Sequence, residues 1–209
     1  MARGKLITFE GIEGVGKTTQ IQRLCAWLQA RKCPLVVTRE PGGTALGERL
    51  RELLLAPSEP PMASLTELLL MFAARAEHLS QIIRPNLDRG NWVLSDRFID
   101  ASYAYQGGGR QISPATVAIL EQLVLAGLAP DMTILLDAPP AIGLQRAAAR
   151  RGAPDRFEQE RVEFYLRVRQ AYLARAEAEP ARVVVIDATA SEEQVAAAIA
   201  HAMVTRFSL

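Results

Sequence analysis

The segment 10-EGIEGVGKTT-19 decides the fold class, because it has the spacing of a phosphate-binding loop. Gly11 is followed, after four residues, by Gly16-Lys17-Thr18, and the pattern lies between an apolar strand-like run and a helical pattern. Glycines let backbone amides converge on phosphate oxygens, and the N-terminus of a following helix adds positive partial charge. A glycine-rich turn without a ligand is the weaker alternative, since pattern and context agree. We therefore expect a nucleoside triphosphate to bind here.

Within this loop, we expect Lys17 to reach the β and γ phosphates of ATP and the Thr18 hydroxyl to bind Mg²⁺. Two carboxylates, Glu10 and Glu13, stand at the mouth of the loop and inside it, which is unexpected beside a polyphosphate. The loop residues predicted to bind ATP are Gly11, Ile12, Glu13, Gly14, Val15, Gly16, Lys17, Thr18 and Thr19.

Outside the loop, apolar runs of strand length alternate with longer helical patterns. Continuous apolar strands between helices are typical of a parallel sheet covered on both faces. We therefore predict one α/β domain over residues 1–209, a P-loop NTPase fold with a doubly wound, five-stranded parallel sheet flanked by helices. The predicted strands are 5–10, 34–38, 91–96, 131–137 and 182–187, and the main predicted helices are 17–31, 44–55, 64–88, 114–126, 157–178 and a last helix capped by Ser191.

The composition is ordinary for a soluble globular protein, with 49% apolar and 22% charged residues among 209. The formal net charge of +1 predicts neither a nucleic-acid nor a membrane partner. The apolar run 68–74 is far shorter than the roughly 20 residues that a membrane-spanning helix needs. The loop motif begins too early for a signal peptide to precede it, so we expect a cytoplasmic protein.

Two classes of nucleotide-binding protein fit the loop: a kinase with a second substrate, and a switch GTPase that acts by binding partners. The sequence contains no Asn-Lys-x-Asp segment of the kind that reads guanine. A small chain with features suited to an acceptor favours a nucleoside monophosphate kinase. A regulatory nucleotide-binding protein without transfer activity is the alternative from a different class.

Ligands of such sheets bind outside the carboxyl ends of the strands, where Glu10, Arg39 and Asp96 stand. Arg39 has the planar fork that suits a phosphate, although a solvated surface turn is the alternative. Asp96 is placed to bind Mg²⁺ and the neighbouring Arg97 to hold the acceptor phosphate. An internal ion pair between Asp96 and Arg97 is the alternative interpretation.

Two further stretches suit a base. Ser102 and Gln106 offer groups that can meet a base edge, and an amide can face it as a donor or an acceptor. The adjoining glycine run, 107–109, could equally be a flexible loop. Phe72 and Arg75 lie three apart on one predicted helix face, where an aromatic ring could stack on a base and an Arg could donate to its carbonyl. Core packing of Phe72 is the competing interpretation.

The motifs 38-TREPGGT-44, 95-SDRF-98 and 103-YAYQGGGR-110, with the phosphate loop, resemble those of thymidylate kinases over essentially the whole chain. These enzymes phosphorylate dTMP to dTDP with ATP and Mg²⁺, and the resemblance implies a homodimer formed through long helices. Phosphorylation of another pyrimidine deoxynucleoside monophosphate, such as dUMP or dCMP, is the alternative activity. The residues implied to bind dTMP are Arg39 and Arg97 at its phosphate, Phe72 stacked on thymine, Arg75 at O4, Ser102 and Gln106 at the remaining base edge, Tyr105 near the 2′ carbon, and Glu10 at the sugar or Mg²⁺-bound water.

The chain departs from the family pattern at two places. In many members the stacking Phe precedes the Arg by four residues, a position that Met71 occupies here, so Met71 could share the contact. Some members also carry an Arg in the phosphate loop, where this chain has Glu13.

Because phosphoryl transfer needs positive charge around the moving group, the basic segment 146–156 is predicted to form a mobile lid. A solvated basic helix face is the alternative for this segment. Arg146 is implied to contact ATP. The residues predicted to act in catalysis are Lys17, Arg97, Arg150, Arg151 and Arg156.

Overall fold

Strand β1 (Leu6–Glu10) is buried at every position and forms the centre of a five-stranded sheet. The computed structural model describes residues 3–149 and 155–209. The sheet order is β2-β3-β1-β4-β5, and every pairing is parallel, which confirms the predicted doubly wound sheet. The other strands are β2 (Leu35–Arg39), β3 (Trp92–Asp96), β4 (Met132–Asp137) and β5 (Val183–Asp187).

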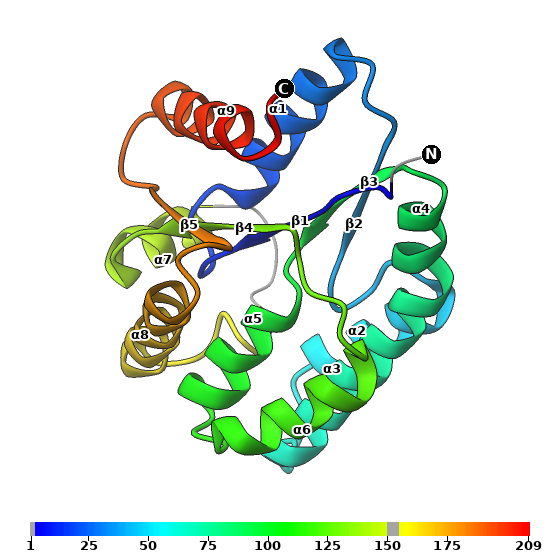
Figure 1. The fold of residues 1–209 in the computed structure, drawn as a ribbon. Coiled ribbons are helices and arrows are strands. Elements are labelled where there is room, and N and C mark those ends of the chain that lie inside the picture. Colours follow the sequence, from blue (N-terminus) through cyan, green and yellow to red (C-terminus); the bar gives the residue numbers. More distant parts are fainter. Residues whose placement is uncertain (1–2, 150–154) are drawn as a thin grey trace.

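Helices cover both faces of this sheet (Figure 1). Helices α1 and α9 lie together on one face, and the helices between β2 and β4 cover the other. The elements are α1 (Lys17–Ala30), α2 (Ala45–Leu55), α3 (Ser64–His78), α4 (Arg84–Asp88), α5 (Ile99–Ser102), α6 (Pro114–Leu125), α7 (Pro140–Ala148), α8 (Val162–Ala178), α9 (Glu192–Phe207), and two π-helical stretches, η1 (Leu79–Ile83) and η2 (Tyr103–Gly109).

Most predicted helices are confirmed, including the long one over 64–88, which is α3, η1 and α4 in continuous succession. The predicted capping box of Ser191 and Gln194 is present at the start of α9. The helix predicted from residue 157 begins later, at Val162. Its expected first turn is a separate turn because the Asp155 carboxylate accepts hydrogen bonds from the amides that follow it, which competes with helix formation.

The hydrophobic core lies on both sides of the sheet. One cluster, which includes Phe9 and Ile134, reaches α1 and α9 on one face and α8 on the other, and the second cluster, which includes Leu68 and Phe98, packs under α3 to α6. Since both faces of β1 are buried in this way, its carboxyl end is held rigidly. In the part of the chain that the structure describes, no helix combines the length and apolarity required to cross a bilayer.

The glycine run 107–109 is helical and packs against α8, so it is not a flexible loop. A Cβ atom on Gly108 would lie 2.8 Å from the Arg167 backbone oxygen and 2.7 Å from the Ala171 Cβ. The run therefore lets η2 approach α8 closely. This contact matters for the site because η2 also carries Tyr105 and Gln106.

We predict that Gly108→Ala lowers the free energy of unfolding by about 1–3 kcal/mol, because the added methyl forces η2 away from the backbone of α8. Gly107→Ala is the matched control, since its Cβ would meet nothing closer than 3.9 Å. Urea unfolding of both variants measures the difference. Equal stability of the two variants would contradict the packing role of Gly108.

Candidate active site

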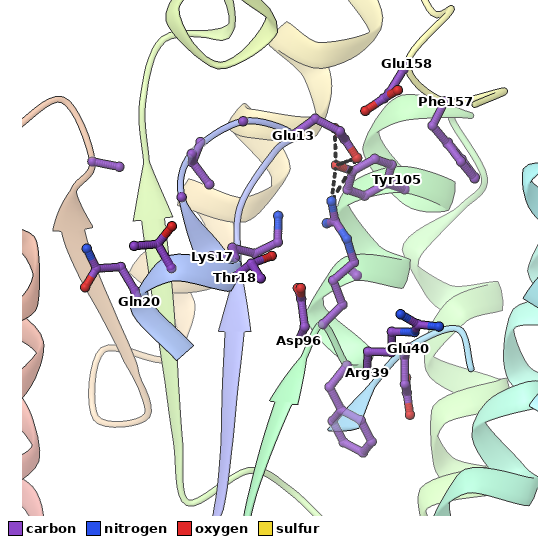
Figure 2. Close-up of a pocket in the computed structure, with 18 of the residues that line it drawn as sticks. Glu13, Lys17, Thr18, Gln20, Arg39, Glu40, Asp96, Tyr105, Phe157 and Glu158 are labelled. Carbon is purple, nitrogen blue, oxygen red and sulfur yellow. Dashed lines mark hydrogen bonds and ion pairs between the residues drawn. The ribbon is translucent and has the colours of Figure 1, made fainter. Parts of the chain in front are cut away.

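A cleft of about 860 Å³ opens at the carboxyl ends of the strands, a volume suited to small-molecule ligands. The phosphate loop forms one wall, the ends of β2 and β3 form the floor, and α3 and η2 supply the opposite wall. Figure 2 shows Lys17 and Thr18 on one side of Asp96, and Arg39 and Glu40 on the other. The strand-end rule thus brought the predicted residues Arg39 and Asp96 to one place, next to the loop.

The phosphate loop depends on backbone conformations that favour glycine. Gly16 has a φ of 93° at the N-cap of α1, and a Cβ there would meet nothing within 4 Å, so its backbone borders open space in the cleft. Gly14 packs against α7, where a Cβ would lie only 1.9 Å from the Gly143 oxygen. The loop is therefore fixed against the fold on one side and open to a ligand on the other.

Lys17 lies folded over this loop, where its Nζ donates to the backbone oxygens of Gly11 (3.1 Å) and Ile12 (3.0 Å). Burial, and after it the nearby Arg97 guanidinium, lowers the pKa of Lys17 to about 8. Its ammonium group is thus held close to where phosphate oxygens would enter.

Arg97 joins the phosphate loop to the far side of the cleft. Its guanidinium donates to Glu13 (2.8 Å), the Gly11 oxygen (3.0 Å) and the hydroxyls of Tyr105 (2.9 Å) and Tyr172 (3.1 Å). Tyr105 also donates to Glu13, and Figure 2 shows these two side chains together at the mouth of the loop. The carboxylate inside the loop therefore acts first as the partner of an Arg on another element.

Glu10 lies behind this cluster and has no exposed surface. Its carboxylate accepts from the Phe98 amide (2.7 Å) and the Tyr172 hydroxyl (2.7 Å). Burial, and next the Asp100 carboxylate, raises the pKa of Glu10 to about 8. Glu10 does not line the cleft, so the expectation that it contacts the sugar is wrong. It stabilises the chain just after Arg97, whose φ of 70° is a left-handed conformation that costs about 1–2 kcal/mol outside glycine.

The opposite end of the cleft carries donors at fixed positions. Arg75 is buried and donates to Glu40 (2.7 Å), Ser102 (3.0 Å) and the Phe98 oxygen (2.9 Å). Glu40 is held in turn by His78, at 2.9 Å from Nδ1. Arg75, Ser102 and Gln106 all line the cleft, so the predicted base-reading residues meet at one end.

The comparisons with known proteins agree with this geometry. A sequence model of the family described as thymidylate kinase matches residues 9–199. The chain is 54% identical to the thymidylate kinase of Alkalilimnicola ehrlichii, over 97% of this chain and 94% of the relative. It is 51% identical to that of Hahella chejuensis over the full length of both. The crystal structure of thymidylate kinase from Ehrlichia chaffeensis superposes with a TM-score of 0.78 at 35% identity, covering 96% of this chain and 99% of that one.

The chain belongs to the thymidylate kinase family. Thymidylate kinases are phosphotransferases that use a nucleotide phosphate donor. The cleft described above has the phosphate loop at one end and the Arg75 cluster at the other.

In this chain, Phe72 does not line the cleft, which contradicts its predicted stacking role. Its side chain is 2% exposed and packs in the core cluster with Phe98, with the Arg75 guanidinium 4.8 Å from its ring centroid. Met71 is half-buried and does line the cleft. The rotation of α3 explains the difference, because a residue four before Arg75 shares its face more closely than one three before.

Of the predicted lid arginines, Arg146 and Arg156 lie within the described residues. Arg150 and Arg151 lie outside the described residues. Arg146 lines the cleft and donates to the Ala188 oxygen at 2.9 Å. Arg156 does not line it; its guanidinium donates to Glu67 (2.7 Å) and the Leu54 oxygen (2.9 Å). The expectation that Arg156 surrounds the transferred group is therefore not met in this structure.

Several residues of the site were not predicted from the sequence. Glu40 and Glu67 are buried carboxylates that hold Arg75 and Gln106, and Tyr172 on α8 bonds to Glu10 and Arg97. Glu67 could have been found from its spacing, because Glu67, Met71 and Arg75 recur every four residues along α3. Tyr172 offers no such signal, because its partners lie on distant segments.

We predict that kcat/KM for ATP falls as the pH rises through about 8, because Lys17 loses its charge in the free enzyme. Bound phosphates favour the charged form, so kcat should stay flat over the same range. Initial rates measured between pH 6.5 and 9.5 test this. The decrease in kcat/KM should be smaller in Lys17→Arg, because an Arg keeps its charge over this range, and an equal pH dependence in that variant would rule Lys17 out as the cause.

We predict that Met71→Ala raises KM for dTMP by about 2- to 10-fold, through the loss of a sulfur contact with the base. Phe72→Leu should leave that KM nearly unchanged and lower the free energy of unfolding by about 1 kcal/mol, since Phe72 packs in the core. Steady-state kinetics and urea unfolding separate the two effects. A larger rise in the KM for dTMP in Phe72→Leu than in Met71→Ala would show that Phe72 is the stacking residue.

Proposed function

We propose that the chain phosphorylates dTMP to dTDP with ATP in this cleft, and that residues of the phosphate loop, the strand ends and the Arg75 cluster hold the two substrates. One observation carries the proposal: Arg97 lies between the phosphate loop and the base-reading cluster, and its guanidinium reaches both Glu13 and Tyr105. In this proposal the phosphoryl group is transferred beside the Arg97 guanidinium. The role of Arg97 is to bind the acceptor phosphate and stabilise the charge that spreads over the moving group.

ATP would bind along the phosphate loop with its base toward α9. Lys17 and the amides of the loop hold the β and γ phosphates. Arg146, Gln20 and Ala188 line the cleft beyond the loop, which supports an adenine site there.

The residues also fit a Mg²⁺ ion. Asp96 Oδ1 is buried and has no hydrogen-bond partner among the residues that the structure describes, although the side chain lines the cleft. The Thr18 hydroxyl lines the same cleft and is exposed to it. Mg²⁺ usually binds one or two protein oxygens together with substrate phosphates, and a donor set of this kind suits it. When bound, the ion neutralises negative charge on the transferring phosphates.

At the acceptor end, Arg39 would bind the dTMP phosphate together with Arg97. Arg39 is exposed and forms an ion pair with Glu48 at 2.8 Å, a contact that an entering phosphate could replace because surface pairs of this kind contribute little stability. Tyr105 packs beside the sugar, and Arg75 donates to the O4 atom of thymine. No general base is needed, since the acceptor phosphate is already an anion at neutral pH.

The lid and the oligomeric state belong to the proposal as well. Arg150 and Arg151 are the remaining candidates to surround the transferred group, in a lid at about 146–156. A homodimer is supported by an apolar surface on two adjacent helices, where Leu65 and Leu69 of α3 and Ile119 and Leu123 of α6 are exposed (Figure 1). The cytoplasmic location of the protein stays a prediction.

We expect the protein to form dTDP from ATP and dTMP, with kcat/KM for dTMP above the values for dUMP and dCMP. Asp96→Asn should lower kcat by at least tenfold and raise the Mg²⁺ concentration needed for half-maximal rate, because it removes a charged ligand of the ion. A coupled assay at several Mg²⁺ concentrations measures both. The absence of dTDP at high enzyme concentration would contradict the proposed function and favour a regulatory nucleotide-binding protein without transfer activity.

A further inference from the structure

Glu67 is a buried charge that the proposed reaction does not use. It lies on α3 one turn before Met71 and has no exposed surface. Its carboxylate accepts from Arg110 Nε (3.0 Å), Arg156 (2.7 Å) and Gln106 Nε2 (2.8 Å). Two guanidinium groups therefore compensate the buried carboxylate, which can only accept hydrogen bonds while it is ionised.

This contact determines how the amide of Gln106 is oriented. An amide has a donor end and an acceptor end, and only its nitrogen can bond to an ionised carboxylate. The Gln106 nitrogen therefore faces Glu67, and its oxygen is turned away from Glu67. Gln106 is 1% exposed and lines the cleft beside Arg75 and Ser102, so its free rotation is restricted by packing as well.

We propose that Glu67 is a positioning residue for base recognition, which fixes Gln106 as a hydrogen-bond acceptor toward the base of the acceptor nucleotide. The inference rests on the proposed function and extends it to the question of which pyrimidine is accepted. Sequence reasoning left both directions of the amide open, and the structure selects one.

The consequence follows from the chemistry of the two pyrimidine edges. Thymine and uracil present an N3–H donor beside the O4 acceptor, whereas cytosine presents an N3 acceptor beside an N4 amino donor. Arg75 can only donate, and a fixed Gln106 oxygen can only accept. Together they match thymine and uracil and leave unpaired groups with cytosine, which is the strongest form of discrimination available to a polar site.

The test compares kcat/KM for dTMP, dUMP and dCMP in Glu67→Gln. A neutral amide at position 67 can accept or donate, so Gln106 is free to turn. We expect the dTMP-to-dCMP ratio to fall on the order of tenfold or more, while the dTMP-to-dUMP ratio stays unchanged because both bases share the same edge. General loosening of the fold would not separate the two ratios in this way.

Two controls separate positioning from structural support. Glu160 pairs with a terminal nitrogen of Arg110, whereas Glu67 accepts from its Nε, so Glu160→Gln disturbs the same network without removing the Gln106 partner and should leave both ratios unchanged. In a Gln106→Ala background, Glu67→Gln should produce no further loss of the dTMP-to-dCMP ratio, since the residue through which it acts is gone. Glu67→Asp keeps an acceptor-only carboxylate and should preserve the ratio.

Two results would overturn the role of Glu67 while the wild type stays active, so that the proposed function still holds. The first is an unchanged dTMP-to-dCMP ratio in Glu67→Gln. The second is a loss of that ratio on adding Glu67→Gln to Gln106→Ala that equals its loss in the wild-type background. If neither Glu67 variant folds, exchange of the Gln106 side-chain amide protons with water in the wild-type dTMP complex decides the question. Slow exchange supports the fixed amide, and fast exchange overturns it.

Discussion

The ion pair between Arg97 and Glu13 is the interaction on which the site depends. It joins the loop after β1 to the corner after β3, two segments that are distant in sequence and adjacent in the sheet. Both side chains are largely buried, and either would be costly without the other. The left-handed Arg97 backbone persists because Glu10 holds the next amide from behind. Two carboxylates that look misplaced beside a polyphosphate thus position Arg97, the cation that we propose binds the acceptor phosphate.

A second principle is that carboxylates hold several of the donors that line the cleft. Glu40 orients Arg75, Glu67 orients Gln106, and Glu13 orients Tyr105. Each donor is therefore fixed before a substrate arrives, so little reorganisation is required at the moment of reaction. The low pKa of Lys17 reflects the same crowding, because burial and a neighbouring guanidinium both disfavour its charge until phosphates enter. The site is poised to gain more from an anion than an open surface would.

The placement of the glycine run shows how local signals can mislead. Three consecutive glycines are typical of a loop, yet 107–109 form part of a π-helical stretch packed on α8. The absence of side chains permits close approach there and is not used for flexibility. That packing places Tyr105 and Gln106 in the cleft, and π-helical turns often occur at functional sites.

The sequence by itself determined the succession of strands and helices along the chain, the phosphate loop, the parallel sheet, and the cleft residues Arg39, Asp96 and Arg97 at strand ends. These follow from patterns within one element and from the rule that parallel strands end at one edge. Only the tertiary structure decided that Met71 and not Phe72 enters the cleft, that Glu10 lies behind it, and that Arg156 binds Glu67. The reason is that the rotation of a helix and the partner of a buried charge depend on segments far away in sequence, which no local spacing encodes.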